Sequence, residues 1–221
     1  MSDAKPGFSL PMDGSADSAV SVLRRFVRKP QPLERCELCG AGIRSVHPHL
    51  FDPAHRQVMC SCDACSILFD TPTGTKYRKV PRRLLALTDF QMPDLLWTGF
   101  AIPVSMAFLC TTTTTEGPVA FYPSPAGAAE AFIPPDSWDE LLAQNPVLRD
   151  MEPDVEALLV NRTSGARGYY LAPIDTCYEL VGITRYFWQG LSGGHEVWQR
   201  ITLFFEGLDA RATTRRRSDG A

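Results

Sequence analysis

The stretch that decides the fold is residues 36–65, which read CELCGAGIRSVHPHLFDPAHRQVMCSCDAC. Five of the seven cysteines of this 221-residue chain lie in it: Cys36, Cys39, Cys60, Cys62 and Cys65. They form one C-x2-C pair, then a gap of twenty residues, then a C-x-C-x2-C group. Two C-x2-C pairs at a distance are typical of a four-thiolate metal site, because each pair forms a tight turn that directs both sulfurs to one point.

The ligands that we predict for this metal site are Cys36, Cys39, Cys62 and Cys65. Gly40 follows the first pair, at a position that often needs a positive φ so that backbone N–H groups can point at sulfur. Two alternates stay open: Cys60 in place of Cys62, and His49 in place of one thiolate.

The metal that we expect is zinc, with iron as the alternative. Four sulfurs in a tetrahedron suit Zn²⁺ or a single iron ion, and four thiolates can also hold an iron–sulfur cluster. The spacing does not separate these cases, and zinc is preferred because structural zinc sites are the commoner use of such turns. The other interpretation, that the cysteines are buried or disulfide-bonded, fits less well because disulfides are rare in the cytosol.

Composition and charge argue against a nucleic-acid-binding protein and against a membrane-spanning protein. The net charge is −3 and the isoelectric point is about 5.8, so no overall basic field for nucleic acid is expected. The hydrophobic fraction of 44% allows a substantial core. The chain has no apolar run of about 18 residues, as a membrane helix requires. The opening residues, MSDAKPGFSLPMDGSADS, do not resemble an export signal, so a cytoplasmic location is predicted.

The chain divides where its composition changes. Five segments are predicted: 1–15 disordered, 16–32 an amphipathic helix and linker, 33–75 the four-cysteine metal module, 76–208 an α+β body, and 209–221 a disordered tail.

Local patterns predict the elements of the module and the body. Residues 49–51 and 57–59 flank a turn at 52–55 and predict a β-hairpin. Further strands are predicted at 96–102, 104–111, 119–122, 156–162 and 168–172. The pattern Ser137-x-x-Glu140 predicts a capping box at a helix start.

A helical hairpin is predicted near the C-terminus. Asp175 is expected to cap a helix that runs to about Trp188, and residues 190–194 form the turn. The second helix places its apolar residues on one face: Val197, Trp198, Ile201, Phe204, Phe205 and Leu208. The predicted fold class is therefore α+β, with an N-terminal zinc-ribbon-like module followed by a mainly antiparallel sheet packed with a helical hairpin.

A short basic stretch follows the module. Residues 77–83 read YRKVPRR and carry four positive charges. Such a stretch either forms a solvated face or contacts a carboxylate-rich partner.

Three parts of the sequence carry a resemblance to a known family: CELCG…HPHLFD…CSCDACSILF, then YRKVP, then PIDTCYELVGITRYFWQGLSGGHEVWQRITLFFEGL. The chain resembles an uncharacterised bacterial family that is encoded near [NiFe]-hydrogenase genes, notably in actinobacteria. The resemblance covers roughly residues 33–210. It implies a context and no mechanism, and it carries over no catalytic residue.

Three functional hypotheses follow. The first is a non-enzymatic accessory or assembly protein whose partner is a hydrogenase subunit or maturation factor. The second is a rubredoxin-like electron carrier with iron in the same cysteines. The third is a metal-dependent enzyme that uses His49 or water in an open site. The first is preferred, because four thiolates leave no open coordination position, and no Walker A loop or dinucleotide-binding glycine pattern occurs.

Overall fold

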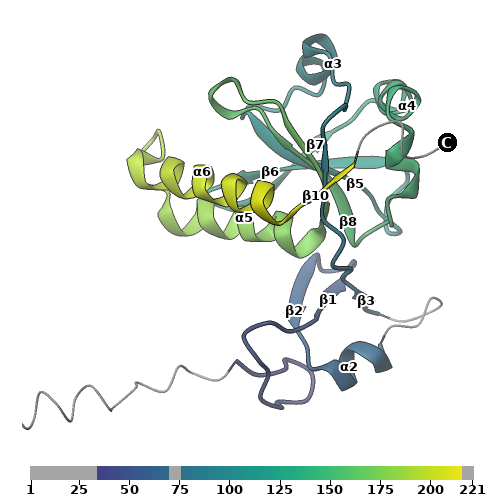
Figure 1. Ribbon diagram of the computed structural model, residues 1–221, viewed down its shortest axis with the longest axis vertical. Helices are drawn as coiled ribbons and strands as arrows, with labels where there is room; N and C mark the ends of the chain where they lie inside the picture. The colour runs from purple at the N-terminus through teal and green to yellow at the C-terminus, as the bar shows by residue number, and fades with distance from the viewer. Residues whose placement is uncertain (1–33, 70–75, 216–221) are drawn as a thin grey trace, which may run out of the picture. The chain divides into compact units, whose positions relative to one another are not determined.

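The computed structural model describes residues 34–69 and 76–215 (Figure 1). The described residues from Arg35 onward belong to one compact unit, which contains a three-stranded and a seven-stranded β-sheet. The disordered segment predicted for 1–15 and the helix predicted for 16–32 lie outside the described residues.

The three-stranded sheet contains the predicted hairpin. Strands β1 (His49–Asp52) and β2 (Gln57–Cys60) pair antiparallel, and β3 (Arg78–Lys79) pairs with the other edge of β1. Asp52 closes the turn, since its Oδ1 accepts the N–H groups of Ala54 at 3.1 Å and His55 at 3.2 Å. The β-hairpin that the sequence predicts for residues 49–59 is thereby confirmed.

The seven-stranded sheet has the order β10-β4-β9-β8-β5-β6-β7. Its strands are β4 (Leu85–Leu87), β5 (Met106–Thr111), β6 (Pro118–Ser124), β7 (Gly127–Phe132), β8 (Glu156–Asn161), β9 (Gly168–Pro173) and β10 (Thr213–Arg215). The β10–β4 pair is parallel and the other pairs are antiparallel, which confirms a mainly antiparallel sheet.

The described residues also form five α-helices and two 3-10 helices. The α-helices are α2 (Asp63–Leu68), α3 (Asp94–Gly99), α4 (Pro135–Gln144), α5 (Ile174–Phe187) and α6 (Gly194–Arg211), and the 3-10 turns are η1 (Pro146–Asp150) and η2 (Thr163–Gly165). Within the described ranges, no helix combines the length and apolar character that crossing a bilayer requires.

The central strands of the large sheet are buried on both faces, as strand β5 illustrates. Met106, Phe108 and Cys110 belong to one apolar cluster, with residues of α5 and α6, whereas Ala107 and Leu109 belong to a second cluster, with residues of α3 and α4. Successive strand side chains point to opposite faces, so the helical hairpin covers one face and α3 and α4 cover the other (Figure 1). The C-terminal helical hairpin packed on the sheet is thereby confirmed.

Trp198 departs from the predicted inner face of α6. It is 39% exposed, and its indole N–H donates to the carbonyl of Ser192 at 3.0 Å. The fully buried stripe of α6 contains Val197 and Ile201, and Trp198 stands about 100° around the helix from Val197. Trp198 is therefore a residue at the edge of the core.

Both predicted helix caps are wrong. Helix α4 begins at Pro135, after Pro134, and α5 begins after Pro173; neither helix has a side-chain cap bond. Pro135 suits the first position of α4 because its fixed φ is already helical and its missing N–H has no partner in the first turn. Asp175 lies in the first turn of α5.

The strand predicted at 96–102 is also wrong, because Asp94–Gly99 forms helix α3. Leu96 and Phe100 are buried whereas Thr98 between them is exposed, which is a helical and not a two-residue repeat. Short apolar runs carry too little periodicity to separate these two structures.

The chain is ordered beyond the predicted boundary at 208. Helix α6 continues to Arg211, and β10 then pairs in parallel with β4, with Thr214 opposite Ala86. The tail predicted for 209–221 is thus structured as far as Arg215, because β10 covers an edge of β4 that would otherwise expose unpaired backbone groups.

Two of the four basic residues at 77–83 form ion pairs with buried carboxylates of the protein itself. Arg78 pairs with the buried Asp154 at 3.4 Å, and Arg83 makes two side-chain hydrogen bonds with the buried Glu156. Arg82 is exposed. The ion pairs of Arg78 and Arg83 favour a structural role for these two residues of the stretch.

Candidate metal centre

The first cysteine pair lies in a tight turn before β1. The N–H of Gly40 donates to the carbonyl of Cys36 at 2.8 Å, and the N–H of Cys36 donates to the carbonyl of Ala41 at 2.8 Å. Gly40 has a φ of 74°, the left-handed conformation expected at this position. The turn directs Cys36 and Cys39 to the same side.

The second pair lies at the start of α2. Cys62 is the N-cap residue, and its sulfur accepts the N–H of Cys65 at 3.4 Å. The sequence predicted two facing turns, and the structure instead supplies one turn and one helix start. Ile67 and Leu68, near the end of α2, are about 70% exposed, whereas Phe69 packs against the cysteines.

Glu37 holds the two halves of the site together. Its N–H donates to the carbonyl of Cys60 at 3.0 Å, and its Oε1 accepts the N–H of Cys60 at 3.0 Å. These bonds fix the first turn against the end of β2, two residues before the second pair begins. Sequence reasoning missed this residue, because a glutamate between two cysteines gives no local sign of its partner.

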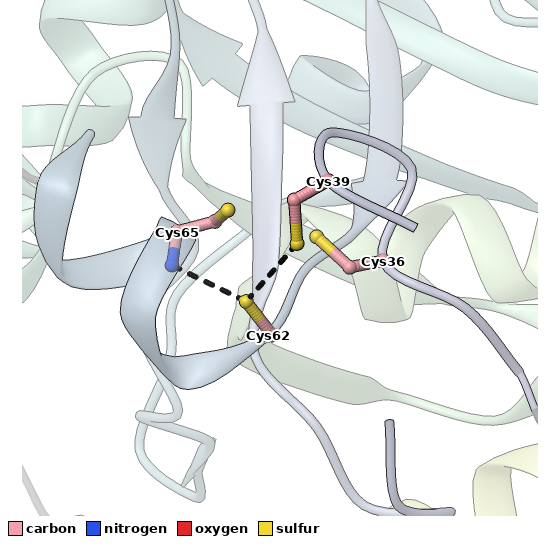
Figure 2. Close-up of side chains that lie close together, drawn as sticks. All are labelled: Cys36, Cys39, Cys62 and Cys65. Carbon is pink, nitrogen blue, oxygen red and sulfur yellow. Dashed lines mark hydrogen bonds between the residues drawn. The ribbon is translucent and has the colours of Figure 1, made fainter. Parts of the chain in front are cut away.

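The four sulfurs converge as Figure 2 shows. They belong to Cys36, Cys39, Cys62 and Cys65, and all lie within 4.8 Å of one another. The sulfurs of Cys39 and Cys62 are 3.7 Å apart. A tetrahedral zinc ion with Zn–S bonds of about 2.3 Å requires sulfur–sulfur separations of about 3.8 Å, so this edge already has the length that zinc needs.

Backbone N–H groups lower the pKa of Cys36. Burial would raise this pKa, but the backbone N–H groups of Cys62, Cys39 and Leu38 lower it to about 6. Donation of N–H groups to sulfur is also how a protein stabilises a metal-bound thiolate.

The neighbouring Cys65 shows the opposite shift. Its side-chain hydrogen bond with Cys62, together with burial, raises the pKa of Cys65 to about 12. Thiolates this close repel one another, and a divalent cation is what allows all four to ionise together. The donor set therefore fits a thiophilic divalent ion.

The two alternate ligands lie outside this cluster. Cys60 and His49 gather with His47 in a separate group. None of the seven cysteines, all of which lie in the described residues, forms a disulfide. The structure thus brings together the four preferred cysteines and separates both alternates from them.

One hydrolase-like pattern occurs away from the cysteines. Residues 190–194 read GLSGG and fit G-x-S-x-G. In a hydrolase the serine lies on a strand-to-helix turn, whereas here Ser192 lies between helices α5 and α6. His195 is exposed at the second position of α6. The pattern lacks the context that a nucleophilic serine requires.

Comparison with known proteins gives a family and no close relative. A model described as "Family of unknown function (DUF5947)" matches residues 35–212, which include both cysteine pairs and every strand of the seven-stranded sheet except β10. No curated protein and no solved structure matches the chain.

Proposed function

The chain belongs to the DUF5947 family of unknown function, and we propose that its cysteine module is a structural zinc site in a non-enzymatic accessory protein. The observation that carries the proposal is the convergence of four cysteine sulfurs within 4.8 Å, two of them 3.7 Å apart.

A structural role is favoured over a catalytic one. Four protein thiolates fill a tetrahedron, whereas a catalytic zinc keeps one position for water or substrate. Among the described residues, the apolar cluster around the site has three buried members, Cys36, Ile43 and Cys65, with four partly buried side chains packed against them. So small a core does not hold a turn and a short helix in place, and metal coordination supplies the missing stability.

The role of the whole protein is proposed to be recognition of a partner protein. The resemblance to proteins encoded beside [NiFe]-hydrogenase genes supports a hydrogenase subunit or maturation factor as that partner. Exposed charges mainly determine encounter rate and specificity. Because Arg78 and Arg83 are bound to buried carboxylates, we choose the exposed Arg82 to test such an encounter.

Metal analysis and a visible spectrum of the purified full-length protein test the zinc proposal. We expect a colourless protein that retains one zinc ion per chain after dialysis and loses it on Cys39→Ser substitution. A red protein that bleaches on reduction supports the rubredoxin-like alternative instead, with iron in the same four cysteines.

Co-purification from the native host tests the partner proposal. We expect a hydrogenase subunit or maturation factor to accompany the tagged protein, and Arg82→Glu to weaken that association without changing metal content. Normal hydrogenase activity in a deletion strain, together with no co-purifying subunit, would remove the hydrogenase role and leave the metal site untouched.

A further inference from the structure

A second group of metal-binding side chains lies beside the four-cysteine cluster. One ring nitrogen of His47, one of His49 and the sulfur of Cys60 lie within 4.8 Å of one another. The strand register explains the grouping, because His49 and Cys60 are directly opposite on β1 and β2 and so project to the same face. His47 precedes His49 by two residues, and the two rings meet edge to face with centroids 4.8 Å apart.

Both imidazoles are oriented by hydrogen bonds at the same ring atom. Nδ1 of His47 donates to the carbonyl of Arg44 at 2.9 Å. Nδ1 of His49 donates to Oδ2 of Asp175 at 2.6 Å. Since Nδ1 carries the proton in both rings, Nε2 is the nitrogen with the lone pair. Donation of one ring nitrogen to a carbonyl or a carboxylate is the arrangement that orients a metal-binding histidine.

The carboxylate that holds His49 comes from a distant part of the chain. Asp175 lies in the first turn of α5, 126 residues from His49, and its Oδ1 accepts the N–H of Thr176 at 2.7 Å. The orientation of His49 is therefore fixed by the body of the protein and not by its own loop. The four-cysteine cluster contains no histidine, so this carboxylate–histidine pair belongs to the second group alone.

We propose that His47, His49 and Cys60 form a second metal site, with Asp175 as the residue that positions His49. Two imidazoles and one thiolate are borderline-soft donors, which suit a first-row divalent ion such as Zn²⁺ or Co²⁺. Three protein ligands leave a fourth position for water or an exchangeable donor.

The second site differs from the first in its number of protein ligands. It offers two imidazoles and one thiolate, whereas the first offers four thiolates, which fill a tetrahedron. We therefore expect the second site to exchange its ion more readily than the four-thiolate site. Its ligands are distinct from those of the four-thiolate site, so the two proposals stand or fall separately.

Titration with Co²⁺ tests the second site, using the full-length protein with zinc retained in the four-cysteine site. We expect one further Co²⁺ per chain, with the visible absorption of a tetrahedral ion and a charge-transfer band from a single thiolate. His47→Ala and His49→Ala should abolish this absorption, and Cys60→Ser should remove the charge-transfer band. Asp175→Asn should weaken Co²⁺ binding by about 10–100-fold.

His55→Ala is the matched control, since His55 lies in the same hairpin but pairs with Asp52 at 3.0 Å, outside the group. It should bind Co²⁺ as the wild type does, and all variants should keep their zinc. The proposal is overturned if the zinc-loaded protein takes up no Co²⁺, or if His47→Ala and Cys60→Ser leave the spectrum unchanged. Because three different side chains are varied, a folding failure in one variant leaves the other two as tests.

Discussion

Replacing Cys36 with serine is expected to release the zinc ion and unfold the first turn and α2. Cys36 is 2% exposed, and its sulfur is one of the four that converge, so its loss leaves three thiolates for the ion. Structural zinc supplies an apparent binding free energy of about 10–16 kcal/mol in small zinc-folded peptides. Hydrogen exchange followed by mass spectrometry should show residues 36–42 and α2 exchanging at the rate of an unfolded segment.

The loss should be confined to part of the chain. Phe51 of β1 and Val80, next to β3, belong to the large apolar cluster that also includes α5 and α6, so β1 should keep much of its protection without metal. The seven-stranded sheet has its own core on both faces and should remain folded.

Cys60→Ala is the matched control for Cys36→Ser. Cys60 lies two residues from a proposed ligand, but its sulfur is outside the four-sulfur cluster, and only its backbone contacts Glu37. It should keep the tightly held zinc. The ligand assignment is wrong if Cys60→Ala loses this zinc while Cys62→Ser retains it.

The four-cysteine cluster was predictable because its signal is local. The spacing of Cys36, Cys39, Cys62 and Cys65 and the glycine at position 40 require only knowledge of turn geometry. The β1–β2 hairpin and the buried stripe of α6 were also predictable, because each follows from periodicity within one segment.

The missed features depend on partners far away in the sequence. The pairing of His49 with Asp175 spans 126 residues, and that of Arg83 with Glu156 spans 73. Asp175 looked like a helix cap because its position near a helix start is typical of one, and only the folded sheet brings it to His49. Charged and polar side chains choose partners through tertiary packing, which single-sequence patterns do not record.

Arg83→Ala is expected to destabilise the whole body by about 3 kcal/mol, because it leaves a buried charge without its partner. Glu156 is 0% exposed, and its Oε1 accepts Nε of Arg83 at 2.8 Å. Arg83 also donates to the carbonyl of Asp150 at 2.8 Å, and this bond is lost as well. The value is placed at the low end of the usual 3–5 kcal/mol because the arginine side chain is 35% exposed, so water can enter in its place.

Urea denaturation at pH 7 with zinc present measures this loss, and two comparisons show its origin. Arg82→Ala, at the exposed neighbour, should change the free energy of unfolding by less than about 0.5 kcal/mol. Replacing both partners, as Arg83→Met with Glu156→Gln, should recover part of the stability lost in Arg83→Met alone, because the buried charge is then gone. If Arg83→Ala unfolds at the same urea concentration as Arg82→Ala, the Arg83–Glu156 pair does not stabilise the fold, and Arg83 returns to the set of surface charges that a partner can contact.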